Sequence, residues 1–149
     1  MSKGKLIGPH KEISVPVEDK DIERLVEDAQ IMYNICYAPL GEYEGFLAIA
    51  HPQITQRDPL RFFVTKDNEI IINPIITLHT KTTIDSVEGC ATFADREAVT
   101  VQRYNKCEVE FQTISKDKKL SEVFKESIGG LRAKIFQHEL DHLDGVYIY

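Results

Sequence analysis

A pentapeptide near the end of the printed sequence has the residue types and the spacing of a metal site. It reads His138-Glu139-Leu140-Asp141-His142. In a helix, side chains four residues apart lie one turn apart on the same face, so both imidazoles can reach one ion. The Glu139 carboxylate lies beside that face and can take a proton from a water molecule held there. The spacing predicts a catalytic divalent-metal site; the alternative is a helix that carries two solvated or core histidines.

A catalytic site of this kind needs a third protein ligand. Seven residues follow His142, and Ile148 stands where an extended zinc-protease motif has a third histidine, so we expect the ligand upstream. The candidates are His10, His51, His79, Cys90 and Cys107. Cys90 stands out because it follows Gly89, and glycine lets the backbone approach another group closely. One thiolate with two imidazoles suits Fe(II), Zn(II), Ni(II) or Co(II).

Two helices are expected to frame the chain. Apolar residues recur at helical spacing over residues 22–36 and form one stripe. The stripe consists of Ile22, Leu25, Val26, Ala29, Met32, Tyr33 and Cys36. Its last member, Cys36, is interpreted as a small buried hydrophobic residue. The second helix is predicted from about Leu131 to Leu143, with Gly145 as a left-handed cap after its end.

The segment between these helices has the pattern of β-structure. We expect strands over residues 46–50, 61–65, 69–72 and 75–78. Residues 97–104 and 107–114 alternate with period two around a predicted turn at 105–106. Residues 120–126 are ambiguous between strand and helix. The predicted fold class is α+β: antiparallel strands around a C-terminal helix that carries the histidines, with a helix near the N-terminus.

Composition restricts the class of protein. The 149 residues are 28% charged and 42% hydrophobic, which predicts a single globular domain over residues 1–149. A net charge of −6 argues against nucleic acid as a direct partner. No apolar run approaches the length of a membrane span. The three cysteines show no paired spacing, which indicates a reducing compartment, with the cytoplasm expected and an organelle as the alternative.

Three motifs resemble those of the peptide deformylase family. Glu88-Gly-Cys-Ala-Thr92 resembles E-G-C-L-S, and the run from Gln137 to Gly145 matches Q-H-E-x-D-H-x-x-G at every fixed position. The run from Phe46 to Gln53 corresponds to G-φ-G-φ-A-A-x-Q, where φ is an apolar residue. The likeness extends from about Val15 to the end of the chain.

The resemblance implies a small α+β domain that removes the formyl group from N-formylmethionine at the start of nascent chains. The implied metal ligands are Cys90, His138 and His142. The implied metal is Fe(II) in the cell, with Zn(II), Ni(II) or Co(II) as alternatives. Glu139 would act as general base and acid. The Gln53 side-chain amide and the Ala91 backbone N–H would bind the oxyanion of the tetrahedral intermediate.

The resemblance also implies which residues face the substrate and which charged residues support the metal site. Substrate-facing residues would be Phe46, Leu47, Ala48, Glu88 and Gly89. Glu88 is expected to pair with Arg103 and hold the cysteine loop, and Asp141 to orient a ligand histidine or brace the helix. The implied partner is an N-formylmethionyl peptide, met during transient contact with the ribosome.

The sequence departs from the family at substrate-facing positions. Phe46 and Ala48 replace the two glycines of the first motif, His51 replaces its second alanine, and Ala91 and Thr92 replace leucine and serine. These changes leave two alternatives to a standard deformylase. One is a related hydrolase with altered acyl or peptide specificity, and the other is a non-catalytic, metal-stabilised binding domain.

Overall fold

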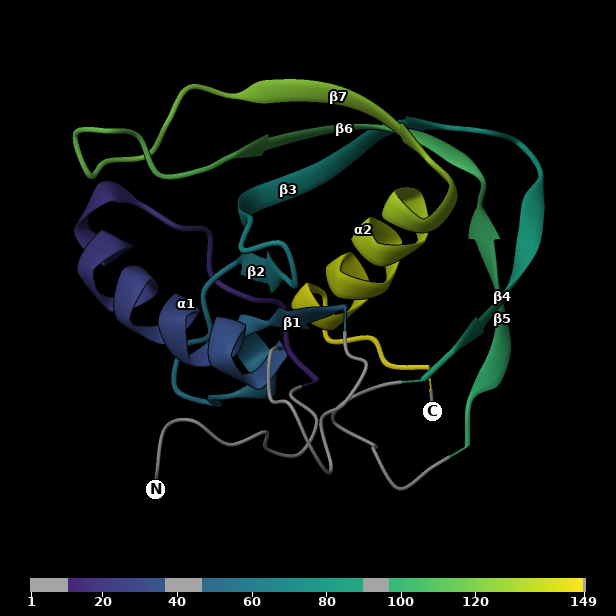
Figure 1. The fold of residues 1–149 in the computed structure, drawn as a ribbon, viewed down its shortest axis with the longest axis horizontal. Coiled ribbons are helices and arrows are strands. Elements are labelled where there is room, and N and C mark those ends of the chain that lie inside the picture. The colour runs from purple at the N-terminus through teal and green to yellow at the C-terminus, as the bar shows by residue number, and fades with distance from the viewer. Residues whose placement is uncertain (1–10, 37–46, 90–96, 149) are drawn as a thin grey trace.

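Residues 11–36, 47–89 and 97–148 are described by the computed structural model. Figure 1 shows the two α-helices of this part on different sides of an antiparallel sheet. The helical elements are η1 (Asp19–Asp21), α1 (Ile22–Cys36), η3 (His51–Gln53) and α2 (Gly130–Leu143). The strands are β1 (Ala48–Ala50), β2 (Phe62–Thr65), β3 (Ile70–His79), β4 (Thr83–Glu88), β5 (Val99–Tyr104), β6 (Lys106–Gln112) and β7 (Phe124–Gly129). The predicted α+β class is confirmed.

The strands form two sheets, and α2 lies between them (Figure 1). The larger sheet has the order β1-β2-β3-β6-β7, and β4 pairs with β5 in a separate two-stranded sheet. Every strand pairing in both sheets is antiparallel. A helix covered on two sides must bury more than one face, and seven residues of α2 are buried, including Glu139 and His142.

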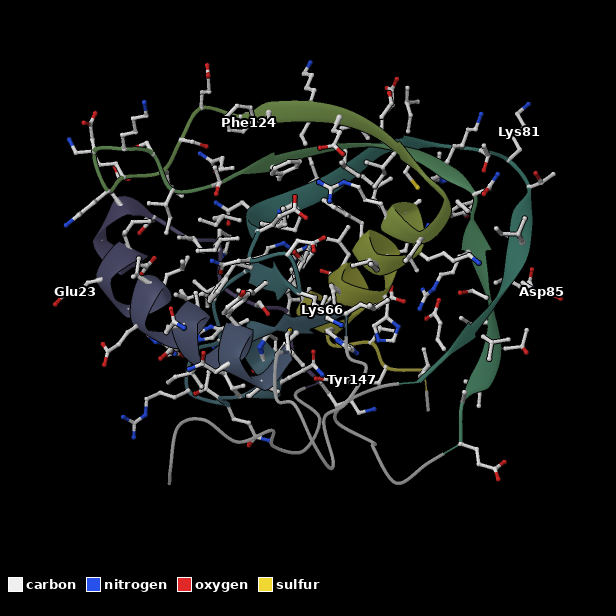
Figure 2. All side chains as sticks on the ribbon, viewed as in Figure 1. Glu23, Lys66, Lys81, Asp85, Phe124 and Tyr147 are labelled. Atoms are coloured by element: carbon white, nitrogen blue, oxygen red, sulfur yellow. The ribbon has the colours of Figure 1, made fainter. Side chains whose placement is uncertain are left out.

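Strand β2 separates two hydrophobic clusters, because side chains alternate across a strand. Phe62 and Val64 pack with α1 residues such as Leu25. Phe63 points the other way and packs with α2, where its ring meets Phe136 edge-on at 5.2 Å between ring centroids. Three of the charged side chains labelled in Figure 2 point outward from this core: Glu23, Lys81 and Asp85.

Helix α1 spans the predicted residues and buries the predicted stripe except at two positions. Val26 is exposed and Tyr33 is only partly buried, so the buried face is narrower than the sequence pattern suggested. Cys36 is 3% exposed, as predicted. Burial, with a smaller contribution from the charge of Glu139, raises the pKa of its thiol to about 12. Cys36 is therefore a protonated core residue at neutral pH.

The strand predictions were right in kind, but the turn predicted at residues 105–106 does not close a hairpin. The two alternating segments around residues 105–106 do not pair with each other: β5 pairs with β4, and β6 pairs with β3 and β7. The chain crosses between the sheets at Asn105, whose carbonyl accepts a hydrogen bond from the Gly130 N–H at the start of α2. The ambiguous segment forms β7, which begins at Phe124.

The predicted strands at 69–72 and 75–78 are one strand, β3, with an irregularity between them. Asn73 has a positive φ of 51°, and the pairing register with β6 shifts there. At this irregularity the Asn73 side chain pairs with the backbone of Val17. Its Oδ1 accepts from the Val17 N–H at 2.8 Å, and its Nδ2 donates to the Val17 carbonyl at 3.1 Å. The irregularity thus ties the segment before α1 to the sheet.

In the described part of the chain, neither helix has the length and apolar character needed to cross a membrane.

Helix α2 ends as predicted, and its end supplies a test of the fold. Gly145 has a φ of +79°, and a Cβ there would lie 2.5 Å from the Lys11 carbonyl carbon and 2.6 Å from its oxygen. Both strain and collision with backbone oppose any side chain. We expect Gly145→Ala to lower the free energy of unfolding by about 2 kcal/mol or more, measured by urea denaturation.

Gly129→Ala is the matched control for this experiment. Gly129 has an extended φ of −149°, and its Cβ would approach nothing closer than 3.5 Å. The control should change stability by less than about 1 kcal/mol. Equal losses in the two variants would contradict the account of the α2 end.

Candidate metal centre and active site

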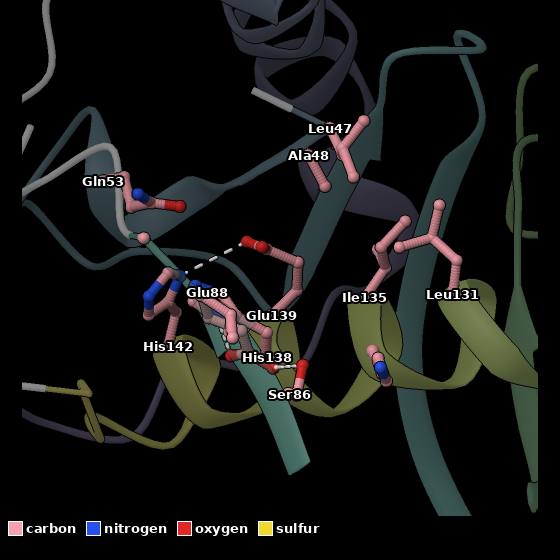
Figure 3. A pocket seen from close by; sticks show the side chains of 13 residues that line it. Leu47, Ala48, Gln53, Ser86, Glu88, Leu131, Ile135, His138, Glu139 and His142 are labelled. Atoms are coloured by element: carbon pink, nitrogen blue, oxygen red, sulfur yellow. Dashed lines mark hydrogen bonds and ion pairs between the residues drawn. The ribbon is translucent and has the colours of Figure 1, made fainter. Parts of the chain in front are cut away.

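Helix α2 brings together the three residues that the pentapeptide predicted. Potential ligand atoms of His138, Glu139 and His142 all lie within 4.8 Å of one another. The two imidazole rings are 4.6 Å apart between centroids and nearly perpendicular, at 81°. His142 and Glu139 are buried, and the His138 side chain is 11% exposed, so the cluster opens to solvent on the His138 side. Figure 3 shows the three side chains at one cavity.

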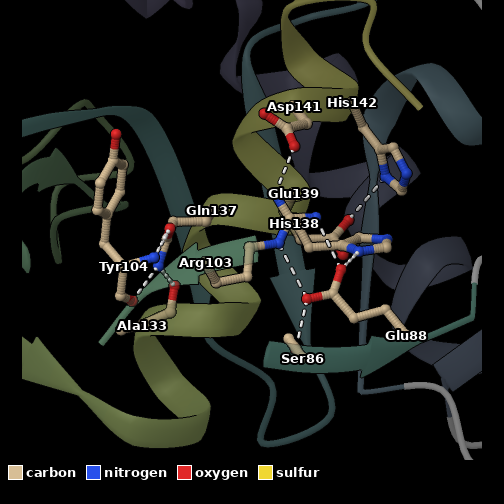
Figure 4. Close-up of polar contacts among 10 residues, drawn as sticks. All are labelled: Ser86, Glu88, Arg103, Tyr104, Ala133, Gln137, His138, Glu139, Asp141 and His142. Atoms are coloured by element: carbon tan, nitrogen blue, oxygen red, sulfur yellow. Dashed lines mark hydrogen bonds and ion pairs between the residues drawn. The ribbon is translucent and has the colours of Figure 1, made fainter. Parts of the chain in front are cut away.

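The Glu88 carboxylate, at the end of β4, holds His138 in one orientation (Figure 4). Its Oε1 lies 2.6 Å from His138 Nδ1 and 2.7 Å from Arg103 Nη2. Its Oε2 accepts from Arg103 Nε at 2.9 Å and from the Ser86 hydroxyl at 2.7 Å. Both oxygens are therefore doubly engaged by donors from β4, β5 and α2.

These contacts fix the charge of Glu88 and the tautomer of His138. Burial alone would raise the pKa of the Glu88 carboxyl, but hydrogen bonds from His138, Arg103 and Ser86 outweigh it and hold that pKa well below its usual range. Burial alone would lower the pKa of Arg103, but its hydrogen bonds to Glu88 and Asp141 outweigh burial and raise that pKa. Because an ionised carboxylate only accepts, His138 Nδ1 carries a proton, which leaves Nε2 with a lone pair for a metal.

Asp141 braces the helix, which is the second of the two roles expected for it. Its Oδ2 accepts from Arg103 Nη1 at 2.6 Å. Arg103 thus joins Asp141 on α2 to Glu88 on β4, and the predicted Glu88–Arg103 pair is confirmed. The carboxylate outside α2 that contacts His138 is Glu88 instead, a role that the sequence reasoning missed.

Gln137 makes a second link between α2 and β5 (Figure 4). Its Oε1 accepts from the Tyr104 N–H at 2.7 Å, and its Nε2 donates to the Tyr104 carbonyl at 2.8 Å. The side-chain amide therefore pairs with a strand as another strand would. This contact fixes how far α2 and its histidines sit from β5.

Glu139 is buried beside His142. Its Oε1 lies 3.3 Å from His142 Nδ1. Burial alone would raise the pKa of the Glu139 carboxyl, but the charge and hydrogen bond of His142 lower it below its usual value. Tyr147 stacks on the other side of His142, with ring centroids 4.7 Å apart. The sequence reasoning did not single out Tyr147.

Gln53 is 1% exposed and contributes to the same cavity from η3. Its Oε1 accepts from the Ala50 N–H at 2.8 Å, so the oxygen of the amide is turned back into its own turn. The amide nitrogen is the donor end of this side chain. Figure 3 shows Gln53 across the cavity from α2.

The cavity has a volume of about 440 Å³, within the range of small-molecule and peptide sites. Of the predicted substrate-facing residues, Leu47, Ala48, Glu88 and Gly89 line it. The lining residues that sequence reasoning missed are Ser86, Val87, Leu131, Lys134 and Ile135. A sequence signal existed for two of them, because Leu131 and Ile135 precede His138 and His142 at spacings that share one helix face.

Five residues named in the sequence analysis lie outside the described residues: His10, Phe46, Cys90, Ala91 and Thr92.

The other upstream candidates for a third ligand do not join the histidine cluster in the described part of the chain. His51 is fully buried, and both of its ring nitrogens make hydrogen bonds, to Asp28 and from the Leu60 N–H. His79 stacks on Tyr104 at 3.7 Å between ring centroids. Cys107 is buried in the hydrophobic cluster around α2.

The donor set fits one divalent cation. Two imidazoles and a carboxylate lie within reach of a common point, and His138 presents a lone pair because Glu88 holds its other nitrogen. Nitrogen donors of this type favour Zn(II), Fe(II), Ni(II) or Co(II) over Mg(II) or Ca(II). The buried carboxylate of Glu139 can serve as ligand or as proton acceptor.

Comparison with known protein families shows which family has this sequence and fold. The model of the polypeptide deformylase family matches residues 8–149. Peptide deformylase of Pelagibacter ubique is 34% identical over 139 aligned positions, and the match covers 91% of this chain and 76% of that protein. Peptide deformylase 2 of Bacillus anthracis is 30% identical over 151 aligned residues, covering 93% of this chain and 79% of that protein.

Solved structures agree with this match. Peptide deformylase from Thermotoga maritima has a TM-score of 0.81 and 28% identity, with 99% of this chain and 96% of that chain covered. The deformylase of Vibrio parahaemolyticus bacteriophage VP16T, solved in complex with actinonin, has a TM-score of 0.77 and 29% identity. That match covers 97% of this chain and 99% of the phage chain.

The Glu88 contacts predict the strength of metal binding. Glu88→Gln keeps the shape of the side chain but removes the charge that receives His138 and Arg103. We expect it to weaken Zn(II) or Co(II) affinity by about 10-fold to 100-fold, measured by competition with a chromophoric chelator.

Glu126→Gln is the matched control, because Glu126 pairs with Arg132 at 2.6 Å near the start of α2, away from the histidines. The control should bind metal as the wild type does. If Glu88→Gln also binds metal with wild-type affinity, the role assigned to Glu88 is wrong.

Proposed function

Because the chain belongs to the polypeptide deformylase family, we propose that it hydrolyses the formyl amide of N-formylmethionine at the N-terminus of nascent peptides. The observation that carries this proposal is the grouping of His138, Glu139, His142 and Gln53 around one cavity. The first three could hold and activate a nucleophile, and Gln53 supplies a donor opposite them. An amide hydrolase needs both features.

We propose His138, His142 and Cys90 as the ligands of one divalent ion. Gly89, the residue before Cys90 in the sequence, lines the cavity, which supports this choice. When bound, the ion would lower the pKa of a water molecule and so supply a nucleophile at neutral pH. Fe(II) is the proposed ion in the cell, with Zn(II), Ni(II) and Co(II) as substitutes. An iron–thiolate site is oxygen-sensitive, which suits the reducing cytoplasm.

Glu139 is the proposed general base and acid. Its carboxylate lies beside His142 and is ionised at neutral pH, because its pKa is lowered. It takes the proton of the attacking water on one carboxylate oxygen and delivers that proton to the amide nitrogen of methionine as the C–N bond breaks. Burial keeps the proton from exchanging with bulk solvent between the two steps.

Gln53 and Ala91 are the proposed hydrogen-bond donors to the oxyanion of the tetrahedral intermediate. The Gln53 Nε2 is the donor end of an amide whose oxygen is held by the Ala50 N–H. Donors fixed before the reaction stabilise developing charge without reorganisation, at about 3–4 kcal/mol each. The backbone N–H of Ala91 is proposed as the second donor from the resemblance alone.

The cavity wall supports a substrate with an apolar first side chain. Leu47, Leu131 and Ile135 line it on the side away from His142 (Figure 3). We propose that these residues receive the methionine side chain, and that Phe46, Ala48 and Gly89 border the peptide. Glu88 lines the cavity too, but both of its oxygens are engaged by protein donors, so we assign it to positioning. The peptide is met as it leaves the ribosome.

The proposed reaction is tested with anaerobically prepared Fe(II) or Ni(II) protein and a formyl-Met-Ala peptide, following the release of the free amine. We expect turnover by the wild type and a loss of at least about 100-fold in kcat for Glu139→Gln. Metal content, measured by plasma mass spectrometry, should be retained in that variant. Glu126→Gln, in β7 beside the start of α2, should keep wild-type turnover.

Other outcomes of this experiment identify other functions. Absence of turnover in metal-loaded wild type would contradict the proposal and favour a binding domain. Turnover that is equal in wild type and Glu139→Gln would contradict the role of Glu139. Cys90→Ser should lower the metal content after purification; unchanged content would contradict Cys90 as a ligand.

A second candidate is a deformylase with altered peptide specificity, and Lys134 is the observation that favours it. Lys134 places a positive charge on the cavity wall, whereas Glu88 and Glu139 there are already engaged by Arg103 and His142. An acidic side chain in the peptide, just after the formylated methionine, would be attracted to the Lys134 ammonium group. A partly exposed pair of this kind contributes on the order of 1 kcal/mol or less.

We therefore expect formyl-Met-Asp-Ala to exceed formyl-Met-Lys-Ala in kcat/KM by about 3-fold to 5-fold at low salt. The preference should shrink with added salt and disappear in Lys134→Met, which keeps the length of the side chain. If the preference for the acidic peptide persists in Lys134→Met, residues other than Lys134 cause it.

A further inference from the structure

His51 is a buried histidine that the proposed chemistry does not use. Its ring is fully buried, with Nδ1 at 2.7 Å from the Leu60 backbone nitrogen and Nε2 at 2.9 Å from Asp28 Oδ2. A backbone N–H can only donate, so Nδ1 must hold a lone pair and Nε2 must carry the proton. His51 is therefore neutral and in one tautomer. The Phe62 ring, 4.7 Å away between centroids, packs against it.

Asp28 anchors this histidine to helix α1. Its side chain is 2% exposed and lies on the buried face of the helix. Arg24, one turn earlier, has its Nε 3.8 Å from Asp28 Oδ2, and it also donates to the carbonyls of Arg57 and Asp58. A buried carboxylate is tolerated only when it is paired and hydrogen-bonded. The network thus ties α1 to η3 and to the segment that ends at Leu60.

The anchored ring starts the turn that carries Gln53. The turn η3 spans His51, Pro52 and Gln53, and the Ile54 N–H closes it by donating to the His51 carbonyl at 3.1 Å. Proline fixes one backbone angle of this short segment. Because the Gln53 Oε1 is held by the Ala50 N–H, a rotation of the turn moves the Gln53 amide with it.

We propose that the buried His51–Asp28 pair is a positioning device that holds the Gln53 amide at the oxyanion site. This inference rests on the proposed function of Gln53. The family motif that this segment resembles has alanine where His51 stands, so the device belongs to this chain. Oxyanion stabilisation depends on donor placement to within about 0.5 Å, and the pair sits two residues from that donor.

The first test separates positioning from folding by its effect on kcat. Asp28→Asn keeps an oxygen that can accept from His51 Nε2, whereas Asp28→Leu removes the acceptor and keeps the branched shape of the side chain. With formyl-Met-Ala peptide, Asp28→Leu should lower kcat by about 10-fold to 100-fold and change KM by less than about 2-fold. Asp28→Asn should restore kcat to within about 3-fold of wild type.

Val109→Ala is the control for a general loss of stability. Val109 is buried in β6 and belongs to the cluster around α2, to which neither η3 nor α1 contributes a buried residue. It should lower the thermal midpoint and leave kcat unchanged. A comparable fall of kcat in this control would overturn the inference.

A double-mutant cycle with Gln53→Ala tests the route of the effect. If Asp28 acts through Gln53, Asp28→Leu should cost less than about 3-fold in kcat once Gln53 is alanine. The same fold-loss in both backgrounds would overturn the inference, because Asp28 would then act through the metal ligands or the fold.

A readout without turnover keeps the inference separate from the proposed function. In zinc-loaded protein, the Gln53 side-chain amide signals are assigned by their loss in Gln53→Met. They should shift in Asp28→Leu and stay in place in Asp28→Asn and Val109→Ala. Unchanged signals in Asp28→Leu overturn the inference. If these shifts occur but the wild type does not deformylate peptides, the positioning stands and the proposed function fails.

Discussion

The hydrogen-bonded carboxylate of Glu88, whose side chain is 10% exposed, is the group on which the rest of the site depends. A carboxylate inside a protein is stable only when donors replace its water, and Glu88 receives them from Ser86, Arg103 and His138. Three elements that are distant in sequence must meet for this to happen. The same contact sets the tautomer of His138. The neutralisation of the Glu88 charge and the orientation of the His138 ring therefore depend on one hydrogen bond.

This constraint explains why the strands divide into two sheets. Strands β4 and β5 leave the larger sheet and lie against the far side of α2, which brings Glu88 and Arg103 over the helix face that carries the histidines. The Gln137–Tyr104 amide pair fixes the same helix to β5. On the other side, Phe63 and Phe136 join α2 to the larger sheet. The face of α2 that carries the histidines is therefore held from two directions.

Local patterns in the sequence predicted the structural features that are set by residues close together in the chain. The His138–His142 spacing, the α1 stripe with Cys36 and the Gly145 cap all follow from helical geometry, and the structure has them. The pairing of β5 with β4 and the contact of Glu88 with His138 join residues far apart in the chain, which periodicity does not encode. Leu131 and Ile135 could have been found from helical spacing. Phe46, Cys90 and Ala91 stay predictions from the resemblance.

The state of His138 in the zinc-loaded protein tests the central claim most directly. Nitrogen-15 spectroscopy of histidine-labelled protein locates the ring proton and measures its exchange with water. We expect a proton on Nδ1 that exchanges slowly, because it is hydrogen-bonded to the Glu88 carboxylate. A proton on Nε2, or an Nδ1 proton that exchanges as fast as that of a solvated imidazole, would contradict it.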